Sequence, residues 1–71
     1  MAEEKADLDP QKLRRLLSYL ADHNHHHVEE LVQWAERIEA AGRGEVTTEL
    51  RKAVELYERM GDHFRAAAEK L

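Results

Sequence analysis

The sequence predicts an all-α protein, an antiparallel hairpin of two helices that dimerises into a four-helix bundle. Apolar residues recur at spacings of three and four along most of the 71 residues, which is the helical period, and one glycine-containing break, Gly42-Arg43-Gly44, divides them. A chain of this length buries a core that leaves only about 3–5 kcal/mol of net stability. Because it has no cysteine, disulfides cannot add to that. Idealised helix packing, self-association or a bound metal is therefore expected to support the fold.

The first helix is predicted over residues 10–41. Residues 1–8 are charged and aperiodic, so we expect a disordered tail there. Asp9 can accept a hydrogen bond from a free backbone N–H, and Pro10 fits the first helical position. Gly42 fits a left-handed cap at the other end. The residues of the predicted stripe are Leu13, Leu16, Leu17, Leu20, Asn24, His27, Val28, Leu31, Trp34, Ala35 and Ile38.

The second helix is predicted over residues 45–71, after a loop at 42–44, so that 9–71 form one domain. Glu45 places negative charge at the N-terminal end of this helix and Lys70 places positive charge at the other, as the helix dipole favours. Leu56, Met60 and Ala67 widen its apolar arc beyond what one partner helix covers. A homodimer of hairpins would cover that arc.

Charge and composition exclude several partners. Eleven Lys and Arg against fifteen Asp and Glu give a net charge of −4, and the basic residues form no block, which disfavours nucleic acid. No stretch approaches the ~20 apolar residues of a membrane span, and the acidic start does not resemble a secretory signal. We expect a soluble, cytoplasmic protein that does not bind membranes.

The histidines carry the only chemical signal. Four of the five lie in His23-Asn24-His25-His26-His27. At about 100° per residue, His27 falls in the apolar stripe and His23 on its edge, while His25 and His26 point to water. The i, i+4 spacing of His23 and His27 is one that helices use to chelate a metal. Glu30 follows on the same flank, as a third ligand or as an acceptor that orients an imidazole.

The predicted hairpin adds a fourth candidate. If the loop is centred near Arg43, His23 stands level with His63 and His27 level with Met60. Gly61 falls at the same level, where a missing side chain leaves room for a crowded polar site. The metal-ligand candidates are therefore His23, His27, His63 and Glu30, with Met60 a weaker one. Imidazole donors without thiolate suit a divalent transition metal such as Ni, Zn, Co or Cu.

The competing interpretation needs no metal. Asn24 and His27 would then form a polar layer that sets the register of the helices, and His63 would be an ordinary surface residue. A catalytic metal centre is disfavoured because two helices offer little concavity. Nucleophilic catalysis is disfavoured as well, since the chain has no cysteine and no phosphate-binding glycine loop. We do not expect an enzyme.

Two segments also resemble a known kind of domain. Residues 16–31, which contain the H-N-x-x-H element, and residues 58–64 look like a little-characterised family of small helical-hairpin domains of anaerobic microbes. The resemblance implies a role in transition-metal handling and points to His23, Asn24, His27 and His63. Tyr19 departs from it, because relatives often place a histidine near that position.

The function predicted is storage, delivery or sensing of a divalent transition metal by a small helical protein with a histidine cluster, with transfer to a partner protein. Asn24 would make supporting hydrogen bonds. The alternative is a metal-free structural or adaptor hairpin that mediates oligomerisation or protein–protein interaction.

Overall fold

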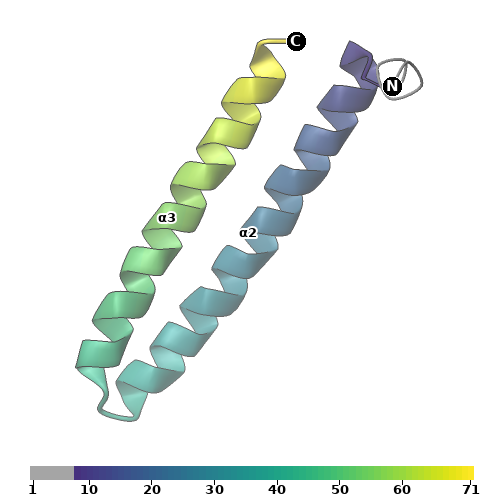
Figure 1. Cartoon of the computed structure of the whole chain (residues 1–71). Coiled ribbons are helices and arrows are strands. Elements are labelled where there is room, and N and C mark those ends of the chain that lie inside the picture. Colours follow the sequence, from purple (N-terminus) through teal and green to yellow (C-terminus); the bar gives the residue numbers. More distant parts are fainter. Residues whose placement is uncertain (1–7) are drawn as a thin grey trace.

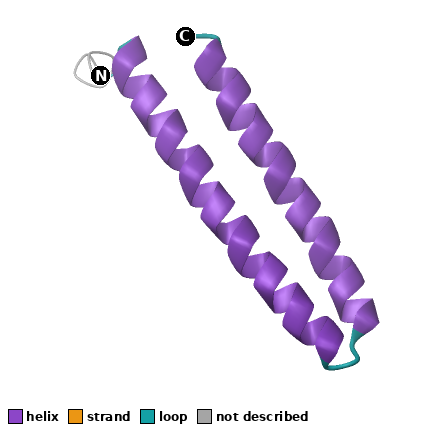
Figure 2. Cartoon of the chain, turned by 180° about the vertical axis from the view of Figure 1, so that it is seen from behind, coloured by secondary structure: helices purple, strands orange, loops and turns teal. Residues whose placement is uncertain are grey.

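The protein is a helical hairpin. A computed structural model describes residues 8–71, in which helix α2 (Pro10–Ala40) and helix α3 (Gly44–Glu69) run antiparallel and side by side (Figure 1). A short loop joins them, and the described residues contain no strand (Figure 2). The hairpin is a rod of 55 × 19 × 17 Å. The all-α class and the antiparallel hairpin are thus confirmed.

Helix α2 begins and ends where local signals predict. The Asp9 side chain accepts a hydrogen bond from the Lys12 backbone N–H at 2.9 Å, and Pro10 is the first helical residue. Gly42 has φ +81°, the left-handed conformation that glycine adopts without strain. The helix ends at Ala40, one residue before the predicted end. The i→i−4 pattern stops after Ala41, because the Gly42 N–H donates to the Glu39 carbonyl and the Arg43 N–H to the Ile38 carbonyl.

Helix α3 is shifted slightly from its predicted bounds of 45–71. It begins at Gly44, since the Thr47 N–H donates to the Arg43 carbonyl at 3.1 Å and closes the first turn. It ends at Glu69, where the Lys70 N–H turns back to the Ala67 carbonyl. Of the predicted tail 1–8, only Leu8 is among the described residues.

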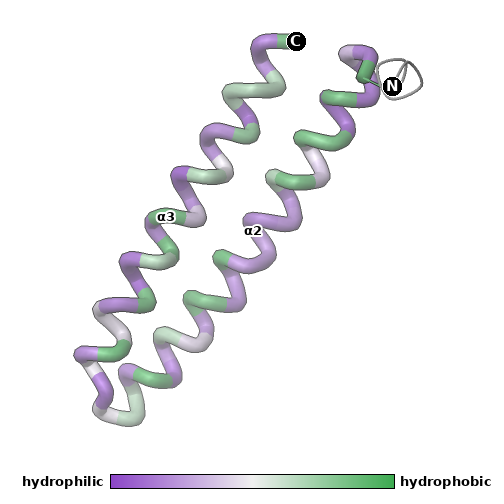
Figure 3. The backbone as a smooth tube through the Cα atoms, in the orientation of Figure 1, coloured by the Kyte–Doolittle hydropathy of each residue, from purple (hydrophilic) through white to green (hydrophobic). Residues whose placement is uncertain are grey.

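The two helices meet along a seam whose residues follow a spacing of three and four. Apolar and polar residues alternate with each turn of both helices (Figure 3). In the part of the chain that the structure describes, no large side chain is fully buried. The core is therefore thin, as expected for a single pair of helices. The buried residues of the seam are Ala21, Asn24, Val28 and Ala35 from α2, with Thr47 and Gly61 from α3.

A polar layer lies in the middle of the seam. Asn24 is only 6% exposed, and its Nδ2 donates a hydrogen bond of 2.6 Å to the Tyr57 carbonyl. Gly61 lies directly against it, because a Cβ on Gly61 would stand 3.1 Å from Asn24 Nδ2. The expected close approach at Gly61 is confirmed. The other amide atom, Asn24 Oδ1, is buried and has no hydrogen-bond partner.

A second polar contact closes the seam near the loop. The Thr47 hydroxyl is buried and donates toward the Ala35 carbonyl at 3.4 Å and the Arg43 carbonyl at 3.2 Å. Outside it, Arg51 Nη2 lies 3.0 Å from Glu39 Oε1 and links the two helices at the surface. These contacts hold the start of α3 against the end of α2.

The two open sides of the hairpin differ. One side, which we call the histidine flank, carries two histidines and several apolar side chains. His23, His27 and the half-buried Leu20 of α2 line a groove there with Met60 of α3, and the exposed Leu16 and Trp34 share the face of the histidine pair at about 100° per residue. The other, the charged flank, is formed by His25 of α2 and by Glu58, Asp62 and Arg65 of α3. Neither described helix has a stretch long and apolar enough to cross a membrane.

Candidate metal centre

His23 and His27 are in direct contact on α2. Their Nε2 atoms lie 3.2 Å apart, and their rings meet edge to face with centroids 4.6 Å apart. His23 is exposed and His27 is half-buried, so a small ion can reach both nitrogens from solvent. The predicted pairing of these two imidazoles is confirmed by this geometry.

The separation of the two nitrogens suits a shared metal ion. A Zn–N bond is about 2.0–2.1 Å long, so two nitrogens bound to one ion stand roughly 2.9 Å apart at a right angle and roughly 3.4 Å apart at the tetrahedral angle. The observed 3.2 Å lies between these limits. Binding would need the proton of each ring to sit on Nδ1, so that both Nε2 atoms present a lone pair toward one point.

Glu30 contacts the far side of one imidazole. Its Oε1 lies 3.5 Å from His27 Nδ1, and its Oε2 lies 3.7 Å from His26 Nε2. A proton on His27 Nδ1 would face the carboxylate, which leaves His27 Nε2 to accept a hydrogen bond from the Nε2–H of His23. Of the two roles predicted for Glu30, this contact favours the one in which the carboxylate orients a ligand.

Two tyrosines contact the histidine pair. Tyr19 stacks on His23 with centroids 5.8 Å apart and an angle of 17°, and Tyr57 of α3 lies 5.9 Å from His27. Neither tyrosine is among the site residues that the sequence predicts. The one signal for Tyr19 was its position four residues before His23, which places both rings on one face.

An apolar groove opens beside the pair. It has a volume of about 300 Å³ and runs between the two helices. Met60 lines it together with His27, which confirms the predicted level of these two residues. The residues around the groove are Leu20, His23, Asn24, His27, Tyr57, Met60 and Phe64.

His63 lies apart from the pair. It follows Gly61 by two residues, so at about 100° per residue it points away from the seam. It is exposed and does not line the groove. The structure therefore does not bring His63 to His23 and His27 within one chain, and a ligand role for it stays a prediction.

The remaining predicted residues are placed as follows. His25 and His26 are exposed, as expected, and lie 3.7 Å from Glu29 and Glu30 respectively. Asn24 makes its hydrogen bond to the backbone of α3 and none to a histidine, as in the interpretation in which it forms a polar layer. Among residues 8–71, no group of three or more His, Cys, Asp or Glu side chains is arranged to hold a metal ion.

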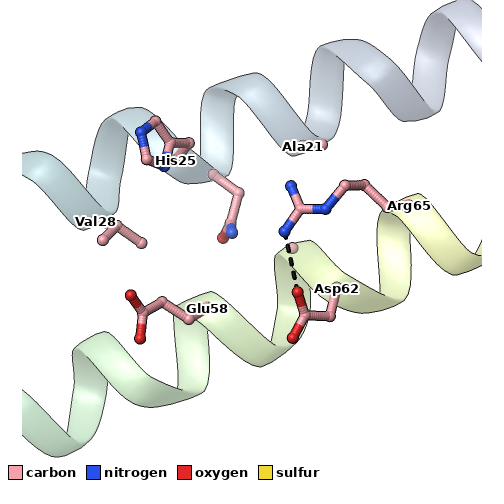
Figure 4. Close-up of a pocket in the computed structure, with 8 residues that line it drawn as sticks. Ala21, His25, Val28, Glu58, Asp62 and Arg65 are labelled. Carbon is pink, nitrogen blue, oxygen red and sulfur yellow. Dashed lines mark hydrogen bonds and ion pairs between the residues drawn. The ribbon is translucent and has the colours of Figure 1, made fainter.

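The charged flank holds a second hollow, with a volume of about 430 Å³ (Figure 4). Arg65 reaches over it from α3 and pairs with Asp62 at 3.0 Å, while Glu58 lies one turn away on the same helix. His25 and Val28 face it from α2 (Figure 4). The arginine and the two carboxylates lie close together here, so the hollow has no single charge sign.

Comparison with known proteins defines a family and no activity. Residues 13–71 match a domain of unknown function, DUF8180, and the chain belongs to this family. No curated protein and no solved structure is similar enough to match the chain. The resemblance to hairpin domains with an H-N-x-x-H element stays a prediction.

Proposed function

We propose that this protein binds a divalent transition metal through His23 and His27, to store, deliver or sense it. The observation that carries the proposal is the 3.2 Å between the two Nε2 atoms, a separation that one bound ion would give. The Glu30 carboxylate beside His27 Nδ1 supports it, because metal-bound histidines usually donate their second N–H to such a group.

The proposal includes the nature of the metal and its route. Imidazole donors without thiolate favour Zn, Ni, Co or Cu over Mg or Ca. Both imidazoles are within reach of solvent in the single chain, which suits a cytoplasmic carrier that takes up the ion and passes it to a partner protein. Metal binding requires neutral imidazoles, so acid should release the ion.

Calorimetric titration with Zn, Ni, Co and Cu tests this proposal. Wild type and His25→Ala should bind alike, since His25 is exposed, pairs with Glu29 at 3.7 Å and lies on the charged flank. His27→Ala should bind at least tenfold more weakly, because it removes one of two ligands. Equally weak binding by all three proteins would overturn the proposal that His23 and His27 bind the metal.

The second candidate is a metal-free adaptor hairpin. The observation in its favour is the exposed apolar surface of the histidine flank, where Trp34 is 53% exposed and Met60 45%. Surfaces of this kind mark protein–protein contacts. This candidate expects that chelators leave the melting temperature unchanged and that His27→Leu raises it, whereas the metal proposal expects the chelator to have the larger effect.

A further inference from the structure

One chain supplies an incomplete metal site. Structural and transport sites for zinc-like ions have four donors, and His23 with His27 provides two. In residues 8–71 no third histidine or carboxylate is placed to join them. The other donors must come from solvent or from another molecule.

The histidine pair lies at the centre of α2. The helix runs Pro10–Ala40, so His25 is its middle residue, and His23 and His27 lie equally far from it on either side. Leu16 and Trp34 are also equally far from the middle. A second copy of α2, laid antiparallel with full overlap, therefore brings His23 opposite His27 of the other copy.

The same overlap pairs the exposed apolar residues. Leu16 and Trp34 are 49% and 53% exposed, and a two-fold axis at the helix midpoint sets each against the other in the second copy. At about 100° per residue, these two residues and the histidine pair lie within about 40° of one another around α2. One face of the helix thus holds both the ligands and the contacts that would bring two copies together.

Helix α3 fits this arrangement. Met60 lines the groove beside His27 and is 45% exposed, so it lies near the same level of the hairpin. A two-fold axis at this level places Met60 against its own counterpart, and the unbranched methionine side chain adapts to such a contact. The contact is isologous, as two-fold symmetry requires.

From these observations we infer that the ion sits on the two-fold axis of a homodimer, held by His23 and His27 of both copies. The inference rests on the proposed function. Four imidazoles fill a tetrahedral site and leave no open position for a substrate. The two loops then lie at opposite ends of a four-helix bundle, and the second copy is the occupant of the histidine flank.

Zn(II) and Co(II) titrations of the full chain, followed by sedimentation equilibrium and by the visible spectrum of Co(II), test the inference. We expect one ion for every two chains, a dimer stabilised at least tenfold by the ion, and the intense absorption of tetrahedral cobalt. His23→Ala should abolish the absorption, while His25→Ala, which changes an exposed residue paired with Glu29, should retain it.

A second variant separates the dimer from the ligands. Trp34→Glu leaves both histidines in place but sets a charge in the apolar contact, so it should yield monomers that bind the ion at least tenfold more weakly. Gln33→Glu adds the same charge on the face of α2 turned away from α3 and should behave as wild type.

The outcomes distinguish the two proposals. One ion bound per monomer, or equal affinity in Trp34→Glu and Gln33→Glu, would overturn the two-fold site and leave the metal function standing. No binding of either ion by wild type would overturn both. A dimer that forms without metal would then favour the adaptor hairpin.

Discussion

The two flanks of the hairpin are built from the same two helices but present opposite chemistry. The charged flank places the Asp62–Arg65 ion pair of 3.0 Å beside the Glu58 carboxylate and the exposed His25, so it is polar and mixed in charge. The histidine flank exposes Leu16, Trp34 and Met60 around two imidazoles in contact. The difference teaches that, among residues 8–71, exposed apolar surface and a contacting pair of imidazoles lie together on one side of the rod.

The largest stability effect is expected in the seam between the flanks. Val28 is 7% exposed, and Val28→Ala should lower the free energy of unfolding by about 2 kcal/mol through lost apolar contact and a small cavity. Val46, in the first turn of α3, is 49% exposed, and Val46→Ala should cost less than about 0.5 kcal/mol. Urea denaturation at low protein concentration measures both. Equal losses would mean that the Val46 side chain is as well packed as Val28 in the free chain.

Glu30 tests whether the histidine flank is organised around a ligand. Glu30→Gln removes the charge that faces His27 Nδ1 at 3.5 Å and should weaken Zn(II) binding about tenfold. Glu29→Gln is the matched control, because Glu29 contacts only the exposed His25, and it should change affinity less than about twofold. The same loss in both variants would assign the effect to general charge and not to orientation of the ligand.

The Asn24–Gly61 contact separates the two flanks and is testable by a double-mutant cycle. Gly61→Ala alone should stabilise α3 by about 1 kcal/mol through helix propensity. However, the new Cβ would stand 3.1 Å from Asn24 Nδ2, and the hydrogen bond from this Nδ2 to the Tyr57 carbonyl holds the amide in place. We therefore expect little or no net stabilisation in wild type.

In an Asn24→Ala background, Gly61→Ala should recover about 1 kcal/mol, because the obstructing amide is gone. Thermal and urea denaturation of the four proteins give the coupling. Additive effects would contradict the close contact.

The smallest effect is expected on the charged flank. Asp62→Asn breaks an ion pair whose partners are both mostly exposed, so the unfolding free energy should change by less than about 0.5 kcal/mol. Salt up to 0.5 M should reduce even this difference. A loss of unfolding free energy above about 1 kcal/mol would show that the Asp62–Arg65 pair stabilises the fold.

Helix bounds were predictable to within two residues because their signals are local. Asp9, Pro10 and Gly42 act through their own backbone chemistry, and each acts as expected. A short loop centred near Arg43 fixes which residues of the two helices stand at the same height, so the position of Gly61 beside Asn24 was predictable as well.

The ligand set was harder to predict. Equal height along a hairpin does not decide the direction of a side chain, and His63 shares the level of the pair while pointing outward. The rings of Tyr19 and Tyr57 were missed because their contacts depend on side-chain rotamers, which spacing does not reveal. The orienting contact of Glu30 was one of two roles that spacing left open.

The unpaired Asn24 Oδ1 has a consequence for motion along the rod. An entirely apolar seam would separate along its whole length in one step. In this seam the buried Asn24 Oδ1 lacks a donor, so the free-energy cost of letting in water is lowest in the middle, where water can supply the missing hydrogen bond. We therefore expect the two helices to separate as two independent segments, one on the loop side of Asn24 and one on the side of the free ends. We expect hydrogen exchange to reveal two separate protected blocks, with the amides of the free-end block exchanging first.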